Sequence, residues 1–222
     1  MIELKDITKE YSSNGAHIVR ALKGINLSVK EGELVVLRGA SGSGKSTILS
    51  LIAALSKPTT GEVVVDGERV SKLQDNFASE YRRETIGFVF QRYNLIPTLS
   101  VKENIILPLI PINLDAKELE DRLFRVLKMF HIEHKKEQLV KNLSGGEQQR
   151  VAIARANINN PKIILADEPT ANLDEKLSLH FIEMLRELKL QGKTIIIATH
   201  DPLFFNLDFV DRVFEIHQGE II

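Results

Sequence analysis

Apolar runs with few polar interruptions alternate along this chain with segments that repeat apolar residues at the spacing of a helix. Three such runs occupy Leu34 to Leu37, Ile163 to Ala166 and Thr194 to Thr199. Strands of this kind are typical of a parallel sheet that helices cover on both faces. Glycine or polar residues follow these runs, and parallel sheets bind ligands at the carboxyl ends of their strands. The pattern predicts an α/β fold with its site at that edge.

The first third of the chain predicts a different arrangement. Short β-rich runs separated by turn residues cover Ile2 to Ile7, Ile25 to Val29 and Val63 to Val65, and Asp66-Gly67 follows the last of them. Alternating strands and turns of this kind indicate antiparallel pairing. We therefore expect an N-terminal antiparallel β lobe beside the mainly parallel sheet.

The spacing of apolar residues predicts that the middle of the chain is mainly helical. Asp115 to Phe130 and Glu147 to Ile158 both place apolar residues at the helical period. No internal repeat or low-complexity linker divides the sequence. We expect one domain, residues 1–222, with a core and β lobe at 1–91 and 161–222 and an inserted helical subdomain at 92–160.

Composition and charge exclude several classes of protein. The 29 basic and 30 acidic side chains leave a formal net charge of -1, so strong nonspecific attraction to nucleic acid is not expected. The chain has no cysteine, which excludes disulfides, thiolate zinc sites and a catalytic thiol. Its opening residues, MIELKDITKE, do not resemble a signal peptide, and no run of about 18 apolar residues occurs. We therefore expect a cytosolic protein.

A glycine-rich loop follows the first buried run. It matches the pattern G-x-x-x-x-G-K-[ST] and leads into a helical stretch from Thr47 to Leu55, which is the strand, loop and helix order of a phosphate-binding loop. Backbone amides would face the β and γ phosphates of a nucleoside triphosphate, Lys45 would add a full charge, and the Ser46 hydroxyl would face Mg²⁺. A Gly/Ser-rich surface turn is the alternative, but it does not explain the flanking strand and helix. The candidate nucleotide-binding residues are Gly39, Ala40, Ser41, Gly42, Ser43, Gly44, Lys45, Ser46 and Thr47.

Two acidic residues, Asp167 and Glu168, directly follow the second buried run. Both carboxylates are expected at the sheet edge where the triphosphate would lie. Because adjacent side chains of an extended strand diverge, Asp167 can hold Mg²⁺ through water while Glu168 polarises the water that attacks the γ phosphate. Taken alone, the pair is also typical of a solvated turn. Behind a phosphate loop, it predicts hydrolysis of the nucleotide.

A second helix start with glycines lies in the segment LSGGEQQR. Ser144 and Glu147 have the spacing of a capping box, which local structure alone could explain. The paired Gly145 and Gly146 weaken a helix start unless a ligand must approach the backbone closely. Since one triphosphate does not fit two phosphate sites of one chain, we infer a two-fold dimer. Ser144 and Gly146 of one copy would cap the γ phosphate held by Lys45 of the other.

With this segment the chain resembles the ATPase subunits of ATP-binding-cassette (ABC) proteins, because Leu143 to Glu147 match the signature motif of that family. The match covers nearly the whole chain and implies ATP as the nucleotide. It implies that Tyr11 stacks on adenine, that Gln91 contacts Mg²⁺ and senses a transmembrane partner, that Asn172 to Asp174 cross the dimer interface, and that His200 contacts the γ phosphate. Taken alone, Tyr11 would be rim packing, Asp174 a helix cap and His200 a polar edge residue.

The segment from Ile86 to Pro97 resembles the branch of lipoprotein-releasing (LolD), macrolide-export (MacB) and cell-division (FtsE) ATPases. The resemblance implies a peripheral subunit at the cytoplasmic face of the plasma membrane, docked on a separate FtsX-like permease. This segment and Val101 to Leu109 are unusually apolar. Part of this run must belong to the core, and a residual exposed patch would be a docking groove for a partner. The chain departs from many relatives at Ala54, where they carry glycine after the phosphate-loop helix.

The transport function has two alternatives that the sequence can address. A cytosolic assembly ATPase without a membrane partner remains the alternative. DNA-repair relatives carry zinc-binding cysteines or long coiled coils, and ribosome-acting relatives fuse two cassettes, neither of which this sequence has. A GTP-binding switch would need a guanine-reading Asn-Lys-x-Asp loop, and the sequence contains none.

Overall fold

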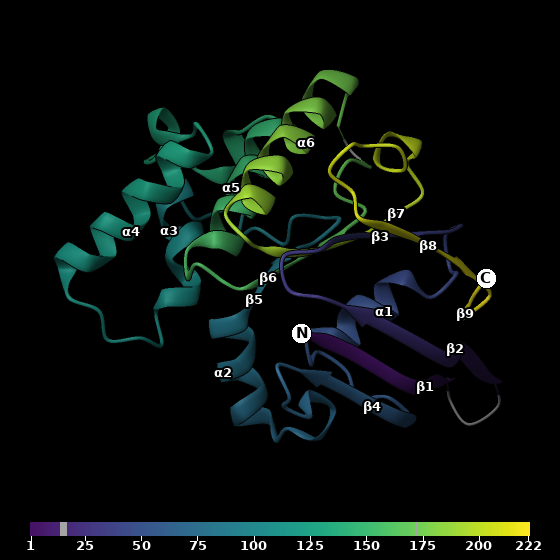
Figure 1. The fold of residues 1–222 in the computed structure, drawn as a ribbon. Helices are drawn as coiled ribbons and strands as arrows, with labels where there is room; N and C mark the ends of the chain where they lie inside the picture. The colour runs from purple at the N-terminus through teal and green to yellow at the C-terminus, as the bar shows by residue number, and fades with distance from the viewer. Residues whose placement is uncertain (14–16, 172) are drawn as a thin grey trace.

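The computed structural model describes residues 1–13, 17–171 and 173–222, which form two sheets with helices around them (Figure 1). The strands are β1 (Ile2–Ser13), β2 (His17–Val29), β3 (Leu34–Arg38), β4 (Thr60–Val65), β5 (Ile86–Val89), β6 (Ile163–Asp167), β7 (Thr194–Thr199), β8 (Arg212–His217) and β9 (Glu220–Ile221). The helices are α1 (Lys45–Ile52), α2 (Asp75–Thr85), α3 (Val101–Ile106), α4 (Ala116–Met129), α5 (Gly145–Asn157) and α6 (Glu175–Leu190). The described helices include none that is long and apolar enough to cross a membrane.

The larger sheet has six strands in the order β5-β6-β7-β3-β8-β9, parallel except for the pairing of β8 with β9. Successive residues of β3 face different cores, with Leu34 and Val36 in one and Val35 in the other. Both faces are therefore buried, as the continuous apolar runs predict. Arg38 at the end of β3 pairs with Thr199. The register thus brings the carboxyl ends of β3 and β7 side by side, and β6 ends next to β7.

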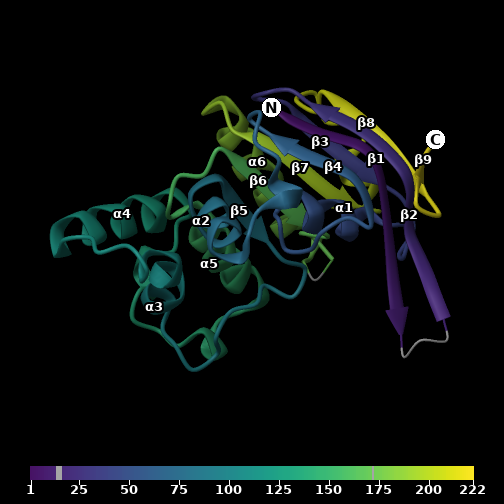
Figure 2. The same ribbon diagram turned by 90° about the horizontal axis from the view of Figure 1, so that it is seen from below.

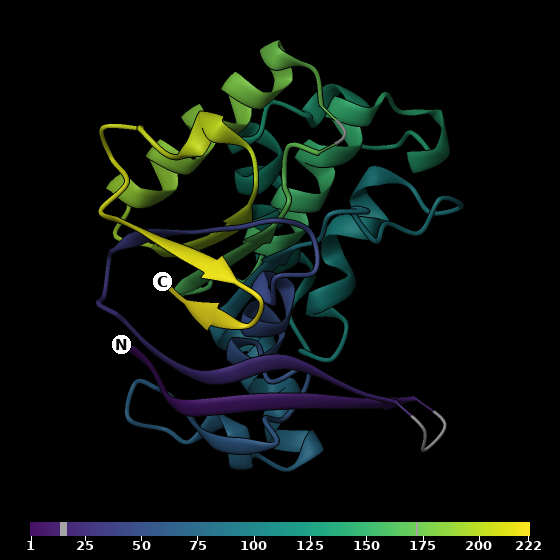
Figure 3. The ribbon, with the colours of Figure 1, turned by 90° about the vertical axis from the view of Figure 1, so that its right-hand side faces the viewer.

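The smaller sheet is the predicted antiparallel lobe, with three strands in the order β2-β1-β4. Helix α1 lies between this lobe and the larger sheet (Figure 1). Its residues Ile48 and Leu51 share one buried cluster with Leu4 of β1 and Leu37 of β3. The hairpin of β1 and β2 continues beyond this core and projects away from the body of the molecule (Figures 2 and 3).

Helices cover the other face of the larger sheet, and their cluster includes Phe130, Val151 and Phe181. The predicted helical segments are close to the observed ones. Asp115 caps the start of α4 by accepting a hydrogen bond from the Glu118 N–H at 2.8 Å. The limits of the helical subdomain, 92 and 160, stay a prediction.

Several elements were not predicted from the sequence, namely α2, α3, α6, β8 and β9. Helix α2 is dominated by charged and polar residues, and Ala78 and Tyr81 are its buried positions. Strand β8 is partly exposed along most of its length, so its sequence lacks a continuous apolar run. The sequences of α2 and β8 therefore give no clear local pattern, whereas α6 does, with Phe181, Ile182, Leu185 and Leu188 buried at helical spacing.

Ala54 occupies a backbone conformation that favours glycine. Its φ is 50°, in the left-handed region, just after the end of α1. This backbone conformation explains why a glycine suits the position.

The variant Ala54→Gly is expected to be more stable than the natural chain by about 0.5–1 kcal/mol, or roughly 1–3 °C in melting temperature, because glycine adopts this conformation without the Cβ clash. Ala53→Gly is the matched control, since Ala53 has a φ of -76° and gains nothing from glycine. Thermal unfolding followed by circular dichroism measures both. Equal destabilisation by the two variants would contradict the assignment of strain to position 54.

Candidate functional site

The glycine-rich loop connects β3 to α1, and the helix begins at Lys45. Gly44 is its N-cap, with a φ of 111°. A Cβ at this position would lie 2.8 Å from the main-chain oxygen of Ala21 on β2, so the loop can pass here only as glycine. The loop backbone and the N-terminus of α1 therefore form one concave surface suited to anions.

A cavity of about 320 Å³ lies against this surface. Most of the residues predicted to bind phosphate line it, together with Glu168, Gln91 and His200 from neighbouring strand ends. Ala21 on β2 also lines it and was not predicted, because an alanine inside a strand carries no sequence signal. The described residues that line the cavity are Ala21, Ser41, Gly42, Ser43, Gly44, Lys45, Ser46, Thr47, Gln91, Glu168 and His200.

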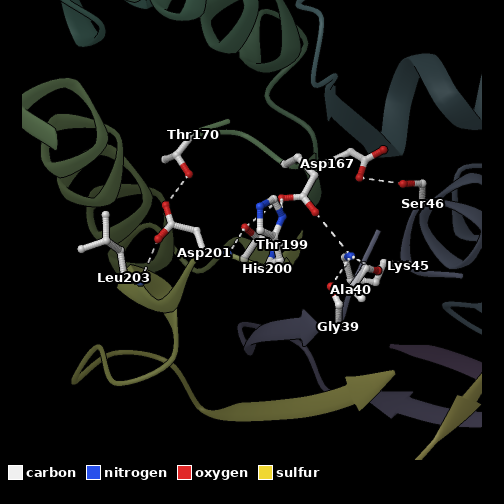
Figure 4. Close-up of polar contacts among 11 residues, drawn as sticks. Gly39, Ala40, Lys45, Ser46, Asp167, Thr170, Thr199, His200, Asp201 and Leu203 are labelled. Atoms are coloured by element: carbon white, nitrogen blue, oxygen red, sulfur yellow. Dashed lines mark hydrogen bonds and ion pairs between the residues drawn. The ribbon is translucent and has the colours of Figure 1, made fainter. Parts of the chain in front are cut away.

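Lys45 is the buried cation of this cavity, with an exposed fraction of 4%. Its Nζ donates to the main-chain oxygens of Gly39 at 2.7 Å and Ala40 at 3.1 Å (Figure 4). The same Nζ lies 3.3 Å from Oε1 of Glu168. The charge is thus fixed between the loop and the acidic strand end, where it can attract phosphate oxygens.

Glu168 adopts a left-handed backbone conformation with a φ of 44°. The prediction that Asp167 and Glu168 continue an extended strand is therefore wrong for Glu168, because the chain turns sharply after β6. The turn directs its carboxylate toward β7, where Oε2 lies 3.0 Å from Nδ1 of His200 and accepts from the Thr199 hydroxyl at 3.1 Å. Strained backbone of this kind is kept when surrounding contacts over-determine it, and it fixes the carboxylate in one position.

Asp167 and Ser46 form a second polar contact in the cavity region. The Ser46 hydroxyl donates to Oδ1 of Asp167 at 2.9 Å (Figure 4). Burial raises the pKa of the Asp167 carboxyl above its usual value. A hydroxyl and a carboxylate are hard oxygen donors of the kind Mg²⁺ prefers. The described residues contain no cluster of three His, Cys, Asp or Glu that could hold a metal ion.

A hydrogen-bond network that was not predicted from the sequence lies beside Glu168. The Thr170 hydroxyl donates to Oδ2 of Asp201 at 2.8 Å, and the Asp201 N–H donates to the Thr199 hydroxyl at 3.0 Å (Figure 4). The network ties the turn after β6 to the loop after β7, and so it fixes Glu168 relative to His200. Polar residues directly after two buried strands are the signal that could have indicated it.

Tyr11 lies on the β1–β2 hairpin with an exposed fraction of 44%. The ammonium of Lys9 lies 4.9 Å from the centre of its ring. The cavity lining described above includes Ala21 from this hairpin, whereas Tyr11 does not contribute to it. Stacking of Tyr11 on adenine therefore stays a prediction.

The predicted second half of the site, Ser144 to Glu147, forms the start of α5, and no residue of that segment is among the described residues lining the cavity. The capping box is confirmed, with the Ser144 hydroxyl accepting from the Glu147 N–H. A ligand is not the only reason for the paired glycines. A Cβ on Gly146 would lie 2.6 Å from the side chain of Leu177, so this glycine also has a packing reason.

The loop predicted to cross a dimer interface ends at Asp174. Asp174 is the N-cap of α6 and accepts a hydrogen bond from the Leu177 N–H at 2.9 Å. The helix-cap interpretation of Asp174 therefore holds, and its interface role stays a prediction. Asn172 lies outside the described residues.

Comparison with known proteins identifies the family. The ABC transporter family model matches residues 22–171. The chain is 46% identical, over 100% of its length, to MJ0796, an ABC transporter ATP-binding protein of Methanocaldococcus jannaschii, and covers 95% of that protein. The chain belongs to the ABC transporter ATP-binding family.

A solved dimeric structure of the MJ0796 cassette matches this ABC chain with a TM-score of 0.91 and 45% identity, over 100% of this chain and 96% of that one. Another solved structure of that cassette is a post-hydrolysis dimer bound to ADP and Pi. The chain is also 42% identical to MacB of Hyphomonas neptunium, a macrolide export ATP-binding/permease protein, of which it spans 34%. This ABC chain is thus an ATP-binding transporter subunit and an ATPase, and the predicted cassette fold is confirmed.

Proposed function

We propose that this ABC ATPase energises a membrane permease by forming an ATP-driven head-to-tail dimer. The proposal rests on one observation: of the two helix N-termini predicted to bind phosphate, the start of α1 and the start of α5, only the first is among the described residues lining the cavity. Lys45 at the start of α1 lines the cavity, whereas Ser144 and Gly146 at the start of α5 are not among the described residues that line it. In a two-fold dimer, each α5 would face the γ phosphate held by the other copy. ATP would then close the dimer through its higher affinity for the closed form.

The chemistry proposed for the site uses the contacts of Glu168. Its carboxylate would take a proton from the attacking water, whose oxygen bonds to the γ phosphorus as the bond to the β–γ bridging oxygen breaks. ADP and phosphate are the products. Lys45 would offset the charge of the phosphates, and His200, 3.0 Å from Glu168, would contact the γ phosphate.

The same proposal includes Mg²⁺, held by Ser46, Asp167 and Gln91. When bound, the ion would neutralise part of the charge on the β and γ phosphates. Ser46 and Gln91 line the cavity, and the 2.9 Å hydrogen bond from Ser46 to Asp167 brings a second oxygen donor next to Ser46. These residues would orient the triphosphate relative to Glu168.

A second cavity, of about 340 Å³, supports the docking of a permease. It is mainly apolar, with three arginines, and none of the described residues that line it is acidic. A partner segment with an apolar face and a carboxylate would complement it. The described residues lining this docking groove are Ala53, Leu55, Arg82, Arg83, Ile86, Phe88, Phe90, Asn94, Pro108, Arg155, Ala156 and Asn159.

The docking groove and the cavity beside the glycine-rich loop meet at Phe90 and Gln91. Phe90 lines the groove and the next residue, Gln91, lines the ATP cavity. Arg155 of α5 donates to the main-chain oxygens of Tyr93 and Asn94, both at 2.6 Å. Movement of a docked partner would therefore be transmitted to Gln91 and to α5 together.

We further propose that the permease is a separate FtsX-like subunit and that this chain binds peripherally at the cytoplasmic face of the plasma membrane. MJ0796, which this chain covers to 95% of its length, is an ATP-binding protein. MacB carries an ATP-binding and a permease function under one name, and this chain corresponds to 34% of it.

The test is an affinity pull-down from detergent-solubilised membranes with a Glu168→Gln bait in MgATP, followed by mass spectrometry. A polytopic FtsX-like protein is expected with this bait and should be lost with the additional change Leu55→Glu, which places a carboxylate in the docking groove. Leu55 is 48% exposed, so the change should not unfold the chain. Leu190→Glu, at an 82% exposed position outside the groove, is the matched control.

Recovery of only cytosolic proteins, while ATP still drives dimerisation, would contradict the permease proposal and favour the cytosolic assembly function. Equal recovery of the permease with the Leu55→Glu and Leu190→Glu baits would place the docking surface elsewhere.

A further inference from the structure

The start of α5 contains a carboxylate in direct contact with the proposed γ-phosphate ligand. The Ser144 hydroxyl donates to Oε2 of Glu147 at 3.0 Å, and the Ser144 N–H donates to the same oxygen at 2.8 Å. The Ser144 hydroxyl, which would donate a hydrogen bond to a phosphate oxygen, therefore donates to Glu147 here. Any phosphate that reaches Ser144 must lie close to this carboxylate.

The phosphate and the Glu147 carboxylate would repel each other at such close range unless a cation lies between or beside them. A glutamine at position 147 would complete the same capping box without the charge, because its side-chain oxygen accepts the same hydrogen bond. The acidic residue of this chain thus needs a compensating positive charge if a second copy is to present a triphosphate here.

The structure supplies that charge from outside the LSGGEQQR segment. Lys135, the last residue of the 3-10 turn η3 (Glu133–Lys135), places its Nζ 3.2 Å from Oε1 of Glu147. Both side chains are 26% exposed, so solvent screens the pair only in part. The N–H of Ser144 and the ammonium of Lys135 also hold the pKa of Glu147 below its usual value, which keeps the carboxylate ionised.

We propose that Lys135 is a positioning residue of the two-chain ATP site. It compensates the charge of Glu147 and holds that carboxylate on the Ser144 cap, so that Ser144 can receive the γ phosphate of the other copy. The inference rests on the proposed head-to-tail dimer. Lys135 acts on closure of the dimer and leaves ATP binding to the single chain unaffected.

The neighbouring residue provides a matched control. Lys136 follows Lys135 directly, has a similar side-chain exposure of 27%, and pairs with Glu120 of α4 instead of Glu147. Lys136→Ala removes the same charge from the same turn while leaving the Ser144 and Glu147 contacts in place. An effect confined to Lys135 would therefore come from its contact with Glu147 and not from net charge.

The experiment measures the MgATP-dependent monomer–dimer equilibrium by analytical ultracentrifugation in a Glu168→Gln background. Lys135→Ala is expected to weaken the dimer roughly tenfold to hundredfold, because each of two symmetric sites loses about three- to tenfold. Lys136→Ala should stay within about twofold of the parent. ATP affinity of the dilute monomer, measured by calorimetry, should be the same for all three proteins.

Replacement of the carboxylate separates this role from a purely structural one. When Glu147→Gln is already present, adding Lys135→Ala should change the dimer constant by less than about twofold, since no charge remains to be compensated. An unchanged tenfold or larger loss in that background, or equal effects of Lys135→Ala and Lys136→Ala, would overturn the inference. A Glu168→Gln parent that stays monomeric in MgATP would instead refute the dimer itself, and the inference with it.

Discussion

Glu168→Gln is expected to retain ATP binding, to hydrolyse ATP about a thousandfold more slowly, and to accumulate as a dimer in MgATP. The amide keeps the shape of the side chain and can still accept from the Thr199 hydroxyl, which lies 3.1 Å from Oε2. It does not take a proton from water, so the chemical step is lost while both phosphate sites remain. Loss of the 3.3 Å ion pair with Lys45 also makes that ammonium more available to the phosphates.

Steady-state phosphate release and size-exclusion chromatography in MgATP measure the two effects. Glu183→Gln, an equivalent exchange at an exposed position of α6, serves as the control and should leave both readings unchanged. Glu168→Gln protein that stays monomeric in MgATP would count against the head-to-tail dimer. Hydrolysis within tenfold of the natural rate would remove Glu168 from its role as base.

Lys45→Ala is expected to weaken ATP binding by about a hundredfold or more, because charge-assisted hydrogen bonds to a phosphate are among the strongest in proteins. Its Nζ also joins the main-chain oxygens of Gly39 and Ala40, so the change removes the charge and loosens the loop together. Isothermal calorimetry measures the affinity, and thermal unfolding measures any loss of stability.

A second buried lysine, Lys193, separates the loss of ATP affinity from the loss of stability. Lys193 is 8% exposed, and its Nζ donates to the main-chain oxygens of Asn160 and Pro161. Lys193→Ala should lower stability and leave ATP affinity unchanged, since Lys193 is not among the described residues lining the cavity. ATP affinity of Lys45→Ala equal to that of the natural chain would refute the phosphate-binding role of Lys45.

Much of the core could be predicted because it depends on short stretches of sequence. The buried strand at Thr194 to Thr199 has the predicted limits, and α4 begins and ends within one residue of its predicted limits. The glycine-rich loop leads from a strand into a helix as its spacing requires. The elements that were missed, such as α2 and β8, have mixed polarity and acquire their form from distant neighbours.

The sequence by itself determined the local parts of the site: the loop around Lys45, the acidic pair at the end of β6, and the cap formed by Ser144 and Glu147. Hydrogen bonds and dihedral preferences within a few residues decide these features, so they can be read from spacing. The tertiary structure decided which contacts form between these parts of the site and the rest of the chain. The turn that directs Glu168 toward His200, and the approach of Lys135 to Glu147, depend on how separate elements pack against each other, which no local pattern encodes.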